Sequence, residues 1–312
     1  DFICTFALRD PAAEVQQQMQ AAGFDVVQVP ASLALADEPQ WLQQHLAAQD
    51  ILVVDGYDFT ADYQRLLKQH RQALVYLDDF VRDYMWADVV LNQAGGVQAT
   101  DYRHEPGTTF CLGPQHGLLR RPFRKTAPAS ELDPTRVFLN MGGADPDNHT
   151  LTVLQQLRQW LPQHTIEVVT GSAYPHQAAL VAATQQWPTV HLHHNLPAEE
   201  MAAVLRRCGV KVCPPSGVAY ECCAVGGLVL LHPTADNQQR LFAYLTGQQL
   251  ALPLIELASL TPPQLPKLAQ HLRQRQQAIF DGQAGPRLRR AFQELALTYS
   301  LVARRATAAD VE

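Results

Sequence analysis

Strand-like and helix-like runs alternate along almost the whole chain, and this alternation limits the folds open to it. In the second half, short apolar runs at residues 137–141, 165–170, 210–213 and 228–231 are separated by segments with helical spacing of apolar residues. Two parallel strands need a long crossover between them, which is usually a helix. The pattern therefore predicts an α/β fold built on parallel sheets.

The first half shows the same alternation, and a basic, proline-rich stretch at residues 122–135, which we expect to be an interdomain linker, separates the two series. A chain of 312 residues is long enough for two domains, each with its own core. We expect domains at 1–122 and 123–300, with a helical tail packing across both. The expected strands of the first half are residues 2–8, 26–29, 51–54, 74–77, 89–91 and 110–112, and the expected helices include 41–48 and 61–69.

Composition excludes several classes of protein. The formal net charge of −6 argues against a nucleic-acid partner, because binding a phosphate backbone needs a basic surface. The apolar runs are too short to span a bilayer, so a soluble cytoplasmic protein with no membrane partner is expected. The six cysteines form no Cys-x-x-Cys pair, which favours buried thiols in a reducing compartment.

One turn carries the strongest functional signal. Ser216-Gly217 follows an apolar run and opens a helical segment in which Glu221 comes five residues after the serine. Backbone N–H groups at such a helix start can hold a diphosphate, and a carboxylate near it can accept bonds from ribose hydroxyls. The alternative is an ordinary helix start with an acidic residue that suits the helix dipole.

Other polar turns follow neighbouring strands of the same half. Carboxyl ends of parallel strands share one edge of the sheet, where α/β proteins bind ligands, so these turns together predict a nucleotide site. Each alone is explained equally well as a tight turn or a polar surface loop. The predicted nucleotide ligands are Gly142, Gly143, Asp145, Gly171, Asn195, Ser216, Gly217, Glu221, Asn237 and Gln238.

His191, His193 and His194 suggest a metal site at first sight. Alternation along a strand separates His194 from the other two, and no carboxylate has ligand spacing, so no metal is expected. In the first half, polar residues again follow strand-like runs. Those that could contact a sugar, or simply cap turns and helices, are Asp55, Tyr57, Asp79, Asn92 and Arg120.

Taken together, these residues resemble a known family. The family is that of the UDP-2,4-diacetamido-2,4,6-trideoxy-β-L-altropyranose hydrolases of pseudaminic acid synthesis, which are related to the peptidoglycan UDP-GlcNAc transferase and its GT-B fold. The resemblance covers about residues 1–300. The matching stretches are residues 54–59 with 63–64, 77–79, 87–93, 112–114, 118–123, 141–145, 216–217 with 220–221, and 236–238.

The resemblance implies two Rossmann-like domains facing a cleft, with the first domain incomplete. It implies hydrolysis of a UDP-linked diacetamido-trideoxy sugar to free sugar and UDP, without metal or cofactor and with inversion. Gly142, Gly143, Ser216 and Gly217 would hold the diphosphate, and Glu221 the ribose. Asn237 and Gln238 would lie on the sugar or phosphate side.

The family pattern also has a first strand and a Gly-x-Gly-His loop whose histidine resembles a catalytic base. This chain begins at what resembles the second strand, so we expect that base upstream of residue 1, with His116 and Asp55 as weak substitutes. Residues 301–312 resemble the start of a GNAT acetyltransferase, a fused or partner domain. Two other functions stay open: a GT-B glycosyltransferase that uses a UDP-sugar, and a non-catalytic protein that binds sugar nucleotides.

Overall fold

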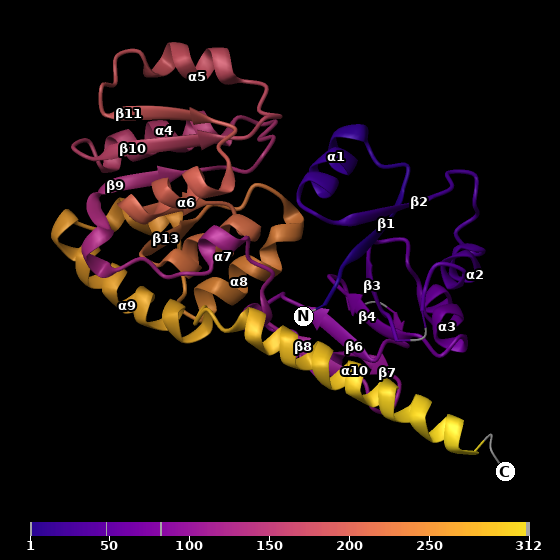
Figure 1. Ribbon diagram of the computed structural model, residues 1–312. Coiled ribbons are helices and arrows are strands. Elements are labelled where there is room, and N and C mark those ends of the chain that lie inside the picture. The colour runs from indigo at the N-terminus through magenta and orange to yellow at the C-terminus, as the bar shows by residue number, and fades with distance from the viewer. Residues whose placement is uncertain (1, 48, 82, 310–312) are drawn as a thin grey trace. The chain divides into compact units, whose positions relative to one another are not determined.

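The computed structural model describes residues 2–47, 49–81 and 83–309, with the backbone alone described at residues 130 and 301–309 (Figure 1). The chain divides into two compact units. The first unit contains the residues up to Val90, Tyr102–Thr109, and the residues from Phe292 on. The second unit contains Leu91–Asp101 and Phe110–Ala291. This division differs from the single boundary expected at residue 122, because residues 110–122 pack with the second unit and the end of the tail with the first.

The first unit carries parallel strands at two places. β1 (Thr5–Arg9) and β2 (Asp25–Val29) pair in parallel around α1 (Ala13–Ala21). A second sheet has the order β3-β4-β6-β8, and the division between the units passes through β6 after Val90 and through β8 after Thr109. Its elements and their neighbours are α2 (Glu38–Gln43), β3 (Ile51–Asp55), α3 (Ala61–Gln69), β4 (Ala73–Leu77), β5 (Tyr84–Met85), β6 (Val89–Asn92), β7 (Arg103–His104) and β8 (Thr109–Leu112).

The strands expected in this half all form, with ends shifted by three residues or fewer. The helix expected at residues 41–48 instead spans Glu38–Gln43. Pro39 lies in its first turn, where a proline costs no helical hydrogen bond and its fixed φ favours the helix start.

The second unit is a six-stranded parallel sheet with the order β11-β10-β9-β12-β13-β14. Numbered within the unit, this order is 3-2-1-4-5-6, the arrangement of a dinucleotide-binding Rossmann sheet. Its elements are β9 (Asp133–Leu139), α4 (His149–Trp160), β10 (Thr165–Thr170), α5 (Gln177–Thr184), β11 (Val190–His194), α6 (Ala198–Arg207), β12 (Cys208–Cys213), α7 (Gly217–Val225), β13 (Leu228–Leu231), α8 (Gln239–Gly247), β14 (Leu252–Pro253) and α9 (Leu265–Ile279).

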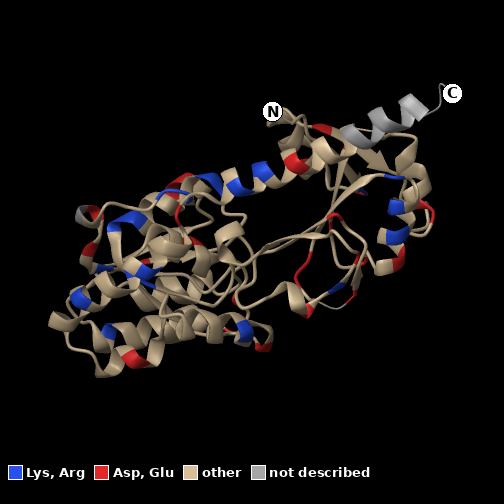
Figure 2. Cartoon of the chain, turned by 90° about the horizontal axis from the view of Figure 1, so that it is seen from below, with Lys and Arg blue, Asp and Glu red and all other residues tan. Residues whose placement is uncertain are grey.

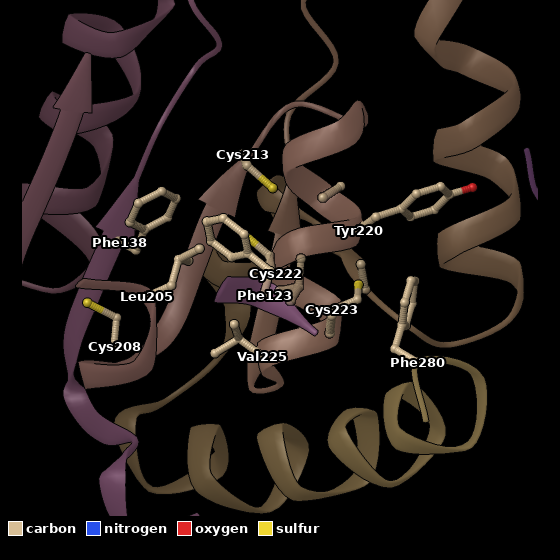
Figure 3. Packing of buried hydrophobic residues seen from close by; sticks show 14 of the residues in the cluster. Phe123, Phe138, Leu205, Cys208, Cys213, Tyr220, Cys222, Cys223, Val225 and Phe280 are labelled. Carbon is tan, nitrogen blue, oxygen red and sulfur yellow. The ribbon is translucent and has the colours of Figure 1, made fainter. Parts of the chain in front are cut away.

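The stretch expected to be a linker belongs to the core of the second unit. Phe123 and Ala127 are buried, and the Ala127 N–H donates to the Val225 carbonyl over 3.1 Å. Figure 3 shows Phe123 among Phe138, Leu205 and the side chains of α7. The expectation of an interdomain linker at residues 122–135 is therefore wrong: Phe123 and Ala127 are part of the core, and β9 already begins at Asp133.

Lys211 lies on β12 with no exposed surface. Its ammonium donates to the carbonyls of Cys208 over 2.5 Å and Gly226 over 2.7 Å. Desolvation by burial lowers the pKa of Lys211 to about 8. The central strand of the sheet therefore carries a basic group whose charged form is disfavoured by burial.

The tail forms α10 (Ala284–Ala309), and the line between the two units passes through it at Phe292. In the first unit, the Tyr299 hydroxyl bonds to the Asp88 carboxylate over 3.0 and 3.1 Å, and Lys68 bonds to the same carboxylate over 2.7 Å. Residues 301–309 continue α10. Residues 310–312 of the expected acetyltransferase start lie outside the described residues.

No helix among the described residues is long and apolar enough to cross a membrane. Basic and acidic residues are interspersed over the described ribbon (Figure 2).

Candidate nucleotide site

The strand order of the second unit places its ligand crevice. The chain runs from β9 outward to β10 and β11 on one side, and from β12 to β13 and β14 on the other. In open α/β sheets, ligands bind at the carboxyl ends of the strands where the order reverses. The loops after β9 and β12, residues 140–148 and 214–216, therefore border the expected site.

The loop after β9 is held by its own side chains. Asn140 accepts a hydrogen bond from the Gly142 N–H over 3.0 Å and donates to the Val169 carbonyl over 2.8 Å. Gly142 has φ +97°, a conformation that favours glycine. Asn140 is a buried polar residue that the sequence did not single out, although it stands two residues before the Gly-Gly pair.

Asp145 and Gly171 have structural tasks in this loop. The buried Asp145 carboxylate accepts bonds from the N–H groups of His149 and Thr150, both over 2.8 Å, and so caps the start of α4. A Cβ at Gly171 would lie 2.3 Å from the Gly143 carbonyl oxygen. Only glycine fits at residue 171, because the loops after β9 and β10 touch there.

Gly143 and Gly217 differ from Gly142 and Gly171. Both are exposed, neither has a positive φ, and a Cβ at either would meet nothing within 4 Å. Among the described residues, neither N–H donates a hydrogen bond. Gly217 also begins α7, whose N-terminus carries partial positive charge. Two open N–H groups thus stand at the reversal of the strand order, where an anion can approach them.

Glu221 lies one helical turn beyond Gly217, so the two residues share a face of α7. Its carboxylate, with the residue only 7% exposed, forms a two-pronged ion pair with Arg120 over 2.7 and 2.9 Å. The bond to Glu221 raises the pKa of Arg120, whose guanidinium also stacks 4.8 Å from the Phe123 ring. Glu221, a predicted ribose ligand, thus pairs with Arg120, a predicted sugar ligand 101 residues earlier in the sequence.

The remaining predicted residues of this unit lie at the same edge of the sheet. The Gln238 side chain folds back onto Thr234, accepting from its N–H over 2.8 Å, while Asn237 is exposed. Asn195 follows β11 with φ 51°, and its N–H donates to the Thr170 carbonyl over 2.8 Å. Ser216 donates its N–H to the Pro214 carbonyl over 2.9 Å, so this amide is already used.

Three predicted sugar ligands gather in the first unit. Asp55, Tyr57 and Asp79 line one small pocket at the carboxyl ends of β3 and β4. The exposed Tyr57 hydroxyl lies 3.4 Å from the Asp79 carboxylate. Burial raises the pKa of Asp79, and the nearby Asp55 and Asp78 carboxylates add to the rise. Asp78 itself supports the turn by accepting bonds from the N–H groups of residues 80 and 81.

Asn92 and His116 both bond to nearby backbone. The buried Asn92 side chain accepts from the Ala94 N–H over 2.8 Å. His116 Nδ1 lies 2.8 Å from the Leu112 carbonyl oxygen. The described residues contain no group of three or more His, Cys, Asp or Glu side chains placed to hold a metal ion. Of the histidine triplet, His193 bonds to Glu167 over 2.8 Å, and His194 to Thr170 over 3.1 Å.

Comparison with solved structures places this arrangement in a known fold. UGT89C1 of Arabidopsis thaliana in complex with UDP aligns over 94% of this chain and 92% of its own, with 9% identity and a TM-score of 0.63. LpCGTa in complex with UDP aligns over 95% and 92%, with 13% identity and a TM-score of 0.62. MurG of Acinetobacter baumannii aligns over 96% and 91%, with 14% identity and a TM-score of 0.53. The chain has the GT-B fold.

Comparison of sequences reveals less similarity to known proteins than comparison of structures. No protein-family model matches the chain. Uncharacterized protein MJ1062 of Methanocaldococcus jannaschii is 20% identical over 189 residues, which are 57% of this GT-B chain and 39% of that protein. The match thus spans well under half of the relative's length, and the identity is too low to assign a family.

Proposed function

We propose that this GT-B chain is an enzyme that binds a UDP-sugar and transfers its glycosyl group to an acceptor. The observation that carries the proposal is the pair of exposed, unbonded N–H groups at Gly143 and Gly217, where the strand order of a Rossmann sheet reverses. Solved GT-B structures that resemble the chain, UGT89C1 and LpCGTa, were determined with UDP bound, which supports the choice of nucleotide.

The proposed glycosyl transfer produces negative charge that the site could stabilise. A nucleophile that attacks the anomeric carbon expels UDP, and negative charge grows on the departing diphosphate. The Gly143 and Gly217 amides and the start of α7 would stabilise that charge without reorganising. Glu221 would accept bonds from the ribose, which follows the diphosphate along α7. Asp55, Tyr57 and Asp79 stay predicted sugar ligands, and the general base stays unassigned.

Titration calorimetry with UDP tests the proposal. In Gly217→Ala, a methyl group would fill the open space over the amide, so we expect UDP affinity to fall roughly tenfold, about 1.4 kcal/mol. Gly247→Ala is the matched control, since residue 247 is an exposed helical glycine whose added Cβ also meets nothing. No UDP binding to the unaltered chain, or equal affinity in all three proteins, would refute the site.

Hydrolysis of the UDP-sugar is the second candidate. The residues at 54–59, 87–93, 141–145 and 236–238 that resemble the UDP-sugar hydrolases favour it. The two reactions differ in one measurable respect, the need for an acceptor. Release of UDP and free sugar from a UDP-linked diacetamido-trideoxy sugar in water alone supports the hydrolase, whereas strict dependence on an added acceptor supports the transferase.

A further inference from the structure

Two histidines meet at the edge of the sheet where the nucleotide site is proposed. His149 is the first residue of α4, which follows β9, and His232 directly follows β13. β9 and β13 are the neighbours of β12 on its two sides. The His232 N–H donates to the Cys213 carbonyl over 3.0 Å, which fixes His232 beside the last residue of β12. The pair therefore joins the elements that flank the turn carrying Gly217.

The two rings share one hydrogen bond. His232 Nε2 lies 3.3 Å from His149 Nδ1, and the ring centroids are 5.3 Å apart. One nitrogen of the two must carry the proton and the other must accept it, so the contact is lost when both are charged. The outer nitrogens, His149 Nε2 and His232 Nδ1, have no hydrogen-bond partner among the described residues.

The groups around the pair act on the protonation of His232. Burial and the neighbouring His149 lower the pKa of His232, while the Asp145 carboxylate opposes that shift. The Asp145 carboxylate is already engaged by two N–H groups of α4. Tyr174, bonded to Asn148, stays neutral because burial raises its pKa to about 12. The ionisable groups of the loops that carry or adjoin the pair are Asp145, Asp147, Tyr174, His176 and Asp236, and His176 Nε2 lies 2.7 Å from the Pro146 carbonyl oxygen.

We propose that His149 and His232 bind a phosphate group of the nucleotide as a singly protonated pair, so that UDP binding takes up a proton. This inference rests on the proposed function and adds to it a pH-dependent selection for the diphosphate over the bare nucleoside. An anion beside the outer nitrogens stabilises the imidazolium, which the free protein disfavours. Because binding takes up a proton, affinity for UDP is highest at low pH and falls as the pH rises through the range in which histidine titrates.

The experiment measures proton uptake directly. UDP is titrated into the 312-residue chain at pH 7.0 and 8.5, in two phosphate-free buffers with different ionisation enthalpies. We expect uptake of a substantial fraction of one proton per UDP at pH 7.0 and almost none at pH 8.5. At these pH values the terminal phosphate of UDP is already largely ionised, because its second pKa is about 6.

Three variants and one ligand complete the test. His149→Gln and His232→Gln should abolish the uptake and weaken UDP binding at pH 7.0 by roughly five- to tenfold. His191→Gln, at an exposed position on β11, should match the unaltered chain. Uridine, which lacks phosphate, should bind all four proteins equally and without proton uptake, which also shows that the variants are folded.

The outcomes separate the two proposals. If the unaltered chain binds no UDP, the proposed function fails and this inference fails with it. If the chain binds UDP without proton uptake, or if the histidine variants keep the uptake, the inference alone is overturned and the nucleotide site stands.

Discussion

The ion pair between Arg120 and Glu221 allows a ribose-binding role for Glu221 to be separated from a structural one. Glu221→Gln keeps the size of the side chain but replaces one carboxylate oxygen by an amide nitrogen, which cannot accept from the guanidinium. A hydrogen bond to a charged group contributes about 1.5–3 kcal/mol. Because the Arg120 side chain is 49% exposed, water makes up part of the loss. We expect the free energy of unfolding to fall by about 1 kcal/mol.

The effect on UDP affinity is separate. If the carboxylate accepts bonds from ribose hydroxyls, the amide loses their charge assistance, and UDP affinity should fall about tenfold, or ~1.4 kcal/mol. Arg120→Met is the matched control, because it removes the cation but keeps the carboxylate. It should cost more stability, about 2 kcal/mol, because the Glu221 side chain is only 9% exposed and loses its partner. Its UDP affinity should change by less than about threefold.

Urea unfolding and calorimetry with UDP and 2′-deoxy-UDP measure the two quantities. The unaltered chain and Arg120→Met should prefer UDP over the deoxy ligand, and Glu221→Gln should prefer neither. The reasoning is refuted if Glu221→Gln binds UDP as the unaltered chain does, or if both variants lose affinity equally. Glu221 would then serve only the ion pair.

Three further predictions concern Gly171, Lys211 and the cysteines. Gly171→Ala should lower the free energy of unfolding, measured in urea, by about 2 kcal/mol, because the new Cβ would collide with the Gly143 backbone. A stability equal to that of Gly247→Ala would contradict the collision. Relative to Lys211→Met, the unaltered chain should gain about 1 kcal/mol of stability from pH 7 to pH 9. Because folding lowers the pKa of Lys211, the unfolded chain binds more protons, and the unaltered chain gains stability as the pH rises. A difference in stability between the two proteins that stays constant with pH would refute this. In native protein a thiol reagent should modify Cys4, which is exposed, and reach the other five cysteines only after denaturation.

The strands were predictable because each is a short apolar run bounded by turn residues. Residues 165–170 and 228–231 form strands with the expected ends. The linker prediction failed because residues 122–135 include three prolines and two basic residues, and nothing in that composition marks Phe123 as buried. Burial depends on what α6 and α7 present to this stretch, which no local pattern records.

The candidate site was predictable by position but not by contact. Gly143 and Gly217 stand in the expected turns, since the carboxyl ends of parallel strands converge. The pairing of Arg120 with Glu221 joins residues 101 positions apart, and the contact of His149 with His232 joins residues 83 positions apart. No periodicity spans such separations, and both contacts depend on the completed sheet.

The bracing of the loop after β9 bears on the thermodynamics of binding. Asn140 ties this loop to Gly142 and Val169, Asp145 ties it to α4, and Gly171 lies against Gly143. A loop held in this way has little conformational entropy left to lose when a ligand arrives. At the proposed site, more of the interaction energy with a diphosphate would then appear as affinity, and association would need no slow ordering step. Gly171 would contribute to recognition through the rigidity of this loop alone.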